Sequence, residues 1–437
     1  MTMGNRRINN VADVVRWRLC LGCGACVHVC PENNIRLVDV LGQGIRPYVE
    51  LTKCKQCGEC IKVCPGVEIK SAPANNQLIS ELRQAWGPVL EIWEGYATDP
   101  EIRFKGSSGG VTTALALFCL EKRGTSGVLH IGACPEAPLQ NVAVFSKSRE
   151  ELLARTGSRY SPAAPCEKLS WIQKAESASV FIGKPCDVVA LRKSQIVNPV
   201  LSNKVVLAIS IFCAGTPSTA GTYAILNSIG VDASEVKALR YRGNGWPGKT
   251  VAKVKGKDGK KLEMTYEKSW GEILSKHIQT RCRFCPDSTG EFADISCGDP
   301  WYREIEPGNP GWSLVLVRTE RGRRTLHNAM EAGYVKLERA LPAVLPASQQ
   351  ALLNRRQNLF GRLLAMRLTL TPAPRYSGFS LTANWRSLSA ARKIYSLLGT
   401  FYRVFTRGWH SPLECFADRD TQGLESKDVG TAGGGPI

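Results

Sequence analysis

The residues with the clearest chemistry in this 437-residue sequence are two runs of cysteines near its N-terminus. The pattern C-x2-C-x2-C-x3-C-P runs from Cys20 to Pro31 and returns from Cys54 to Pro65, offset by 34 residues throughout. Such close spacing lets three thiolates converge on one iron–sulfur cube from a tight loop. The repeat therefore predicts two 4Fe–4S clusters.

In a double run of this kind, the fourth cysteine completes the cluster of the other run. We expect this cysteine to open a helix and to point at the other cluster. Gly22, Gly24 and Gly58 should let the backbone pass close to the sulfides. The expected ligands are Cys20, Cys23, Cys26 and Cys64 for one cluster, and Cys54, Cys57, Cys60 and Cys30 for the other.

Structural zinc is the main alternative for these cysteines. Zinc sites use paired C-x2-C elements rather than two such runs, so iron–sulfur chemistry is favoured. The chain has 17 cysteines, and its first residues, MTMGNRRINN, lack the apolar stretch of a secretory signal. Cysteines outside a secretory context argue for metal ligation over disulfides. We therefore expect a cytoplasmic electron-transfer protein.

Four later cysteines also have suggestive positions. Cys186 follows an expected strand, Cys213 ends another, and Cys282 and Cys285 form a C-x2-C pair. Together they could supply four thiolates to a further metal site. Buried free cysteine, a frequent core residue, is the alternative, and spacing alone leaves both open.

The segment KGSSGGV, Lys105–Val111, leads directly into an expected helix. Small residues and free N–H groups at a helix N-terminus bind phosphate well, and the helix dipole adds to the attraction. A serine cap with a glycine turn gives the same pattern. The chain contains neither GxxxxGK[ST] nor GxGxxG, so this is not a Walker loop or a dinucleotide fingerprint.

Composition divides the chain into five parts. We expect a ferredoxin-like α+β domain over residues 1–72, a linker over 73–88, an α/β domain over 89–339, a mostly helical basic extension over 340–418 and a disordered tail over 419–437. In the α/β domain, GVLHIGA, SVFIGKP and KVVLAISIFC read as strands, and helices should begin at Val111 and near Pro217. A hairpin over Thr250–Tyr266 should turn at Asp258-Gly259.

Five motifs in order carry a family resemblance: KGSSGGVTTAL, GSRYSPAAP, GKPCDVVALRK, YRGNGWPG and RCRFCPDSTGEFADISCGDPW. Residues Val89–Arg339 resemble the beta-subunit family of coenzyme F420-reducing hydrogenase and dehydrogenase. An N-terminal double-cluster segment is a known arrangement in that family. The resemblance implies FAD and a third 4Fe–4S cluster held by Cys186, Cys213, Cys282 and Cys285.

The resemblance also implies where the flavin binds. Segments matching Lys105–Thr112 and Gly157–Ser161 contact it, and Asp299 lies nearby. Gly109 is expected to let the backbone approach the pyrophosphate. The implied contact residues are Lys105, Ser107, Ser108, Gly109, Gly110, Thr112, Gly157, Arg159, Tyr160, Ser161 and Asp299.

Plainer readings accompany several of these residues. Asp299 could cap a turn, and Tyr160 could be an ordinary buried tyrosine with a bonded hydroxyl. Lys184 could tune a cluster, although a solvated lysine is the default. Cys297 could contact the flavin, although a packing role is favoured.

These patterns predict an FAD-dependent iron–sulfur oxidoreductase. Electrons would pass between ferredoxin-type clusters and a flavin that exchanges hydride with an organic substrate or the deazaflavin, the former preferred. A non-catalytic relay subunit is the alternative. No acid–base motif suggests catalytic residues, and the expected partner is a protein carrier such as ferredoxin. The formal charge of +19 comes without a nucleic-acid-binding signature, so no nucleic acid is expected.

The basic extension contains one amphipathic pattern. No acidic residue occurs between Arg339 and His410, and Leu388–Arg407 has helical periodicity. Its apolar face could dock on the chain's own α/β domain with the arginines in water, the favoured reading, or meet an anionic membrane at the cytosolic side or an acidic partner. The two faces are Ala391, Ile394, Leu398, Phe401 and Phe405, and Arg392, Ser396, Thr400, Arg403 and Arg407.

Overall fold

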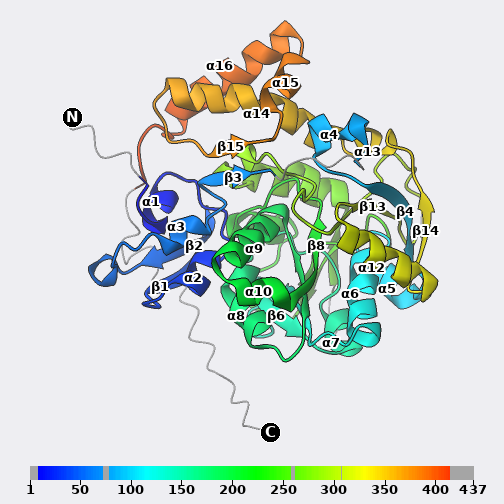
Figure 1. Ribbon diagram of the computed structural model, residues 1–437. Helices are drawn as coiled ribbons and strands as arrows, with labels where there is room; N and C mark the ends of the chain where they lie inside the picture. Colours follow the sequence, from blue (N-terminus) through cyan, green and yellow to red (C-terminus); the bar gives the residue numbers. More distant parts are fainter. Residues whose placement is uncertain (1–7, 72–77, 257–260, 307, 414–437) are drawn as a thin grey trace.

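The computed structural model describes residues 8–71, 78–256, 261–306 and 308–413 (Figure 1). The N-terminal domain wraps short helices around a small hairpin, and its apolar residues pack with the cysteines. Its elements are α1 (Val11–Arg16), α2 (Ala25–Val29), β1 (Ile35–Val40), β2 (Gly44–Val49), α3 (Glu59–Lys62) and β3 (Glu68–Lys70).

The fourth cysteine of each run does not open a helix. Cys30 is the residue at which α2 ends, and Cys64 lies beyond the last residue of α3. The helices begin earlier, after Gly24 and Gly58, which both have left-handed backbone angles. Glycine adopts that conformation without steric cost, so these two glycines set where each helix starts.

The central domain is built on a mixed eight-stranded sheet in the order β14-β4-β13-β12-β8-β7-β5-β6. Its inner strands β5, β7, β8 and β12 run parallel, and antiparallel strands flank them. The strands are β4 (Glu91–Ala97), β5 (Val128–Ala133), β6 (Asn141–Ser146), β7 (Ser179–Gly183), β8 (Val205–Ile211), β12 (Ile295–Gly298), β13 (Ser313–Val317) and β14 (Val335–Arg339).

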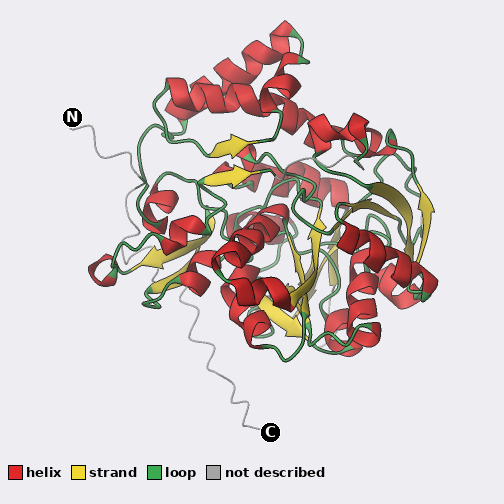
Figure 2. Ribbon diagram, in the orientation of Figure 1, coloured by secondary structure: helices red, strands yellow, loops and turns green. Residues whose placement is uncertain are grey.

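Helices cover both faces of this sheet (Figure 2). Alternation along the strands explains the two layers: Val180 packs with α6 and α12, whereas Phe181 packs with α8 and α9. The helices of this domain are α5 (Pro100–Lys105), α6 (Val111–Lys122), α7 (Arg149–Ala154), α8 (Leu169–Lys174), α9 (Pro185–Val197), α10 (Pro199–Lys204), α11 (Thr219–Ser228) and α12 (Glu320–Glu331).

A second sheet contains the expected hairpin. It has the order β11-β10-β9, with β9 (Val236–Arg240), β10 (Thr250–Val254) and β11 (Lys261–Met264). The expected turn at Asp258-Gly259 lies outside the described residues. The segment expected as a linker contains α4 (Ser80–Trp86), whose Leu82 and Trp86 are buried.

The extension is helical as far as it is described, with one short strand. It contains α13 (Val344–Ser348), α14 (Gln350–Leu368), β15 (Arg375–Ser377), α15 (Leu381–Arg386) and α16 (Ala390–Thr406). β15 pairs in parallel with β3, so the extension adds a strand to the N-terminal domain. The tail expected to be disordered, 419–437, lies outside the described residues. No helix among the described residues is long and apolar enough to cross a membrane.

Candidate cluster and cofactor sites

Site I is a cavity lined by four thiols and apolar side chains from α1, β1 and β2. Three of its cysteines come from the first run and one from the second, which is the crossing that the spacing predicts. Burial, followed by the neighbouring Cys20, raises the pKa of Cys64 to about 11. The thiols of site I belong to Cys20, Cys23, Cys26 and Cys64.

Site II is a second cavity with the reciprocal composition. Its wall includes Asn34, whose amide oxygen accepts a hydrogen bond from the Cys30 thiol at 3.0 Å. Within the described chain, no three His, Cys, Asp or Glu side chains are placed to hold a single metal ion. The thiols of site II belong to Cys30, Cys54, Cys57 and Cys60.

Site III gathers the four later cysteines. Cys186 is the second residue of α9 and Cys213 follows β8, whereas Cys282 lies in the 3-10 helix Thr280–Phe284 and Cys285 directly follows that helix. The thiols are close enough to interact electrostatically: burial and Cys282 together raise the pKa of Cys213 to about 11. Burial also raises the pKa of Cys285 to about 12, with contributions from Asp287, Cys282 and Cys213. The fold therefore brings the four dispersed thiols within electrostatic range of one another.

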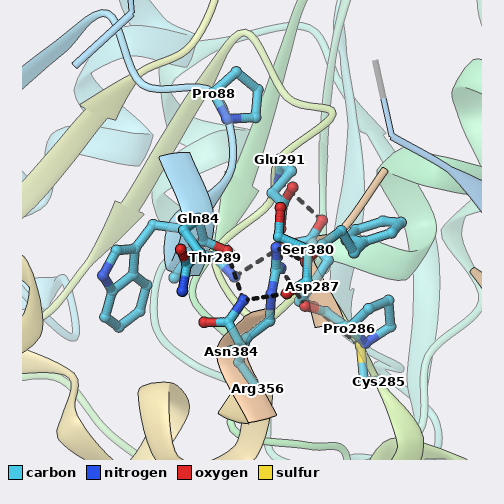
Figure 3. A network of polar contacts seen from close by, with 12 residues as sticks. Gln84, Pro88, Cys285, Pro286, Asp287, Thr289, Glu291, Arg356, Ser380 and Asn384 are labelled. Atoms are coloured by element: carbon cyan, nitrogen blue, oxygen red, sulfur yellow. Dashed lines mark hydrogen bonds and ion pairs between the residues drawn. The ribbon is translucent and has the colours of Figure 1, made fainter. Parts of the chain in front are cut away.

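A buried polar network fixes the loop after Cys285 (Figure 3). The Asp287 carboxylate accepts hydrogen bonds from the backbone N–H groups of Thr289, Gly290 and Glu291 at 2.7–3.1 Å. Burial and the nearby Glu291 raise the pKa of Asp287 to about 6. Arg356 of α14 pairs with Glu291 and donates to the Pro286 carbonyl at 2.6 Å. The extension thus holds site III in shape.

Lys184, next to Cys186, is not the solvated lysine expected by default. Its ammonium pairs with Asp187 at 2.7 Å and donates to the Ala163 carbonyl at 3.3 Å. Asp187 holds the pKa of Lys184 above its usual value despite the opposing effect of burial. The buried pair places a carboxylate and an ammonium near Cys186, and the ammonium also lies near enough to Cys213 to interact with it.

Arg281 connects sites I and III. Its side chain is 1 % exposed, and its guanidinium donates to the carbonyls of Phe284 at 3.0 Å and Pro65 at 3.3 Å. Pro65 follows Cys64 of site I, and Phe284 precedes Cys285 of site III. Among the described residues Arg281 has no carboxylate partner, and its Nε has no hydrogen-bond partner. A buried cation needs nearby negative charge, and an anionic thiolate-bound cluster on either side would supply it.

The predicted flavin segments meet around Ser107. Its hydroxyl accepts a hydrogen bond from the Ser158 N–H at 2.6 Å, so the segments around 105–112 and 157–161 are in contact. Gly110 starts α6 with a left-handed backbone and no capping side chain. α6 has twelve residues, and its uncapped N-terminus leaves backbone N–H groups that could bind a phosphate. Such a helix start fits the pyrophosphate of a flavin dinucleotide.

Arg242 is a site residue that sequence reasoning missed. This residue is 2 % exposed and forms a bidentate ion pair with Asp299 at 2.8 and 3.0 Å. The guanidinium also donates hydrogen bonds to the Tyr160 hydroxyl at 3.3 Å and to the Ser107 carbonyl. Its guanidinium also lies over the ring of Trp301 at 5.3 Å. Arg242 lies in the motif YRGNGWPG, which pointed to this region, but the sequence does not show which groups a guanidinium contacts.

Several predicted flavin contacts have other partners in the fold. The Arg159 guanidinium donates to Asn141 at 2.6 Å and to backbone carbonyls, and the Lys105 ammonium pairs with Glu101 at 2.7 Å. Ser161 is buried and accepts a hydrogen bond from Asn141 at 2.8 Å. Gly157 has a left-handed backbone next to Arg242. These contacts give the residues roles in shaping the loops.

Gly109 and Ser108 are tightly packed. A Cβ at Gly109 would lie 2.6 Å from the Gly95 carbonyl oxygen and 2.7 Å from the Ser313 nitrogen. The fold therefore requires glycine there with or without a cofactor. The Ser108 hydroxyl donates to the carbonyls of Trp312 at 2.7 Å and Gly298 at 3.1 Å.

Thr112 and Cys297 are neighbours at the start of α6. Cys297 is buried in the main core, and the Thr112 hydroxyl bonds its thiol. Burial raises the pKa of that thiol to about 12. This is the packing role favoured for Cys297.

The fold and the cysteine geometry define an iron–sulfur protein with a ferredoxin-like domain on a mixed α/β domain. Comparison of the sequence with known families agrees. Residues 92–170 match the N-terminal and residues 177–342 the C-terminal part of the coenzyme F420 hydrogenase/dehydrogenase beta subunit, and residues 19–66 match a 4Fe-4S dicluster domain. The chain belongs to the coenzyme F420 hydrogenase/dehydrogenase beta-subunit family.

Similar curated proteins carry related names. The chain is 30 % identical over 249 residues to the coenzyme F420 hydrogenase subunit beta of Methanococcus voltae, covering 55 % of this chain and 81 % of that protein. It is 28 % identical to the F420-dependent formate dehydrogenase subunit beta of Methanocaldococcus jannaschii, covering 55 % of this chain and only 60 % of that one. It is 23 % identical to the coenzyme F420-dependent sulfite reductase of the same organism, covering 73 % and 47 %.

A solved structure supports the fold. A chain of the F420-reducing [NiFe] hydrogenase complex from Methanosarcina barkeri superposes with a TM-score of 0.50 at 21 % identity, covering 67 % of this chain and 96 % of that one. Both family profiles end by residue 342, so α14, β15, α15 and α16 lie outside the part that they match.

Proposed function

We propose that this protein is an iron–sulfur flavoprotein oxidoreductase that moves electrons between three 4Fe–4S clusters and an FAD. Site III supports the proposal, because its four thiols come from separate parts of the chain and lie within electrostatic range of one another. The buried, carboxylate-free Arg281 then links it to site I. Two neighbouring anionic clusters would explain why a cation is stable in that position.

Bound FAD would supply the conversion between hydride transfer and single-electron transfer. The uncapped start of α6 would hold its pyrophosphate, and Arg242 and Asp299 would fix the loops beside it. Arg159 would position the loop rather than touch the cofactor. We assign no residue of the chain as a general acid or base for the hydride transfer.

Two alternatives concern the substrate and the catalytic role. Hydride would be exchanged with the deazaflavin F420 or with another organic substrate, and the names of the relatives favour the deazaflavin over the organic substrate preferred from the sequence. The chain could instead be an electron-relay subunit whose chemistry lies in a partner. Proposed partners are a protein carrier such as ferredoxin and, through α16, a membrane on its cytosolic side.

Metal and flavin content of the anaerobically purified full chain tests the proposal. Three cubanes imply roughly 12 irons per chain, and Cys282→Ala with Cys285→Ala should leave roughly eight. Cys119→Ala, at another buried cysteine, is the matched control and should keep all clusters. If the double variant keeps its full iron content, site III holds no cluster.

The flavin is tested separately by reconstitution with FAD. Arg242→Gln should reduce FAD retention by about tenfold or more, because Asp299 and the Ser107 carbonyl lose a charged donor. Absence of flavin absorbance in reconstituted wild-type protein would refute the assignment of FAD as the cofactor.

The substrate and the catalytic role need separate tests. Rapid reduction of the flavin by reduced deazaflavin would identify the deazaflavin as the substrate. Turnover of the isolated chain with an artificial electron donor would exclude a role as a relay subunit only.

A further inference from the structure

Helix α16 packs with the opposite orientation to the one favoured from its sequence. Its buried residues are Ser396, Thr400 and Val404, which are at most 2 % exposed. The large apolar residues of its other face lie in solvent. The exposed fractions of these residues are Ile394 57 %, Tyr395 71 %, Leu398 57 %, Phe401 41 %, Tyr402 69 % and Phe405 50 %.

The reason is the surface of α14 on which α16 rests. The Ser396 hydroxyl accepts a hydrogen bond from Trp385 at 3.0 Å, and a Cβ at Gly361 would lie only 2.2 Å from that hydroxyl oxygen. Only small side chains allow so close an approach of two helices. Ser396 and Thr400 provide them, so the polar face of α16 faces inward and its aromatic face outward.

We propose that this exposed face, which we call the α16 stripe, binds the surface of an anionic lipid bilayer. The stripe consists of the six large apolar residues given above. A contiguous apolar surface of this kind marks an interaction site rather than ordinary solvent-exposed surface. It lies outside the family match, so it is a feature of this chain's extension.

The order of residues around the helix matches the depth profile of a membrane surface. At about 100° per residue, Ile394, Leu398, Phe401 and Phe405 form one arc, and Tyr395 and Tyr402 form its edge. Arg392 and Arg403 lie beyond the tyrosines, about 160° and 180° from Ile394, on the face opposite the apolar arc. In a membrane surface, apolar side chains enter the acyl chains, amphipathic tyrosines lie at the interface, and cations bind the phosphate headgroups.

The charge around the stripe favours lipid over a second copy of this chain. Arg356 and Arg375 of the extension pair with Glu291 and Glu68, and Arg339, just before the extension, pairs with Glu91. The other basic residues of the extension form no ion pair with a carboxylate among the described residues. A second copy docking through the same stripe would place unpaired arginines near unpaired arginines. Anionic headgroups would instead neutralise them.

Co-sedimentation with vesicles tests the proposal on the full-length protein. Phosphatidylcholine vesicles with and without 30 % phosphatidylglycerol are the probes, at low and high salt. Wild-type protein should bind the anionic vesicles and lose binding at high salt. Leu398→Gln with Phe401→Gln should weaken binding by about tenfold or more, and Arg392→Gln with Arg407→Gln should weaken it only for anionic vesicles.

The matched control replaces two apolar residues elsewhere that are, as a pair, more exposed than Leu398 and Phe401. Ile196→Gln with Val200→Gln, at positions that are 81 % and 50 % exposed on α9 and α10, should leave binding unchanged. Iron content and unfolding temperature confirm that each variant is folded. Equal vesicle binding by wild-type protein and the stripe variant would overturn the proposal. So would a wild-type dimer that ignores vesicles and becomes monomeric in the stripe variant.

Discussion

Sites I and II have equivalent cysteine spacing, but the rest of the chain surrounds them differently. Cys20, Cys23 and Cys26 of site I are each 8 % exposed, whereas Cys57 of site II is exposed. The Cys23 carbonyl accepts a hydrogen bond from the Cys166 N–H of the central domain at 3.0 Å. The loop around Cys54 and Cys57 lies mostly in solvent.

This difference gives an order to two otherwise similar sites. Site I is joined to site III through Arg281, and site II has the exposed edge that a protein carrier could reach. Electrons would therefore enter or leave at site II and pass through site I to the central domain. A sequence repeat supplies equivalent ligands, and burial makes them unequal.

Replacement of Arg281 should have the largest effect on this comparison. Arg281→Met removes a buried cation beside two proposed anionic clusters, which should cost about 3–5 kcal/mol of unfolding free energy. The reduction potential of the site I cluster should fall, because its more negative reduced state loses a favourable charge. That of site II should stay unchanged.

Redox titration followed by electron paramagnetic resonance measures both potentials. Arg281→Lys is the matched control, since it keeps the charge and should keep most of the potential. Equal shifts at sites I and II would show that Arg281 acts on the whole fold rather than on site I.

Gly24 and Gly58 form a second matched pair, 34 positions apart. Both have left-handed backbones, so alanine at either should cost about 1–2 kcal/mol. At Gly24 a Cβ would also lie 2.8 Å from the Glu167 nitrogen, whereas at Gly58 it would meet nothing within 4 Å. Gly24→Ala should therefore cost a further ~1–3 kcal/mol.

Anaerobic denaturant unfolding with an iron assay measures that difference. If the two alanine variants are equally stable, the packing of site I against the central domain contributes nothing measurable.

The rate at which each cluster loses iron should increase with the solvent exposure of its cysteine ligands. Under an added chelator, the site II cluster should disappear about tenfold faster than the site I cluster, equivalent to about 1.4 kcal/mol in the cost of opening. Cys57→Ala, which removes a proposed ligand of site II, should abolish the fast phase. A fast phase that survives in this variant would assign the more labile cluster to site I.

The smallest expected effect concerns the exposed lysines near site II. Lys55 and Lys62 pair with Glu32 and Glu59 at 2.7 and 2.6 Å on the surface. Lys55→Gln with Lys62→Gln should slow reduction by an acidic ferredoxin by about twofold at low salt and not at high salt. Stopped-flow reduction measures this rate, with Lys237→Gln, at an exposed position of β9, as the control. An equal loss in the control would indicate a nonspecific effect of net charge.

The sequence alone determined the features that depend on local pattern. Cysteine spacing predicted which thiols line each N-terminal cavity, because a tight loop leaves few ways to arrange them. Apolar runs predicted β5, β7 and β8, and helical periodicity predicted α6, α11 and α16, because backbone hydrogen bonding makes these patterns local. Family motifs identified the four cysteines of site III, although their convergence required the fold.

Only the tertiary structure decided which partners those elements have. The carbonyl partners of Arg281 lie in different domains, and Arg242 meets Asp299 57 positions away, so no local pattern shows either. For α16, periodicity revealed two faces but not which one packs. That choice depended on Gly361, 35 positions before Ser396, because its missing side chain admits a serine and excludes a phenylalanine.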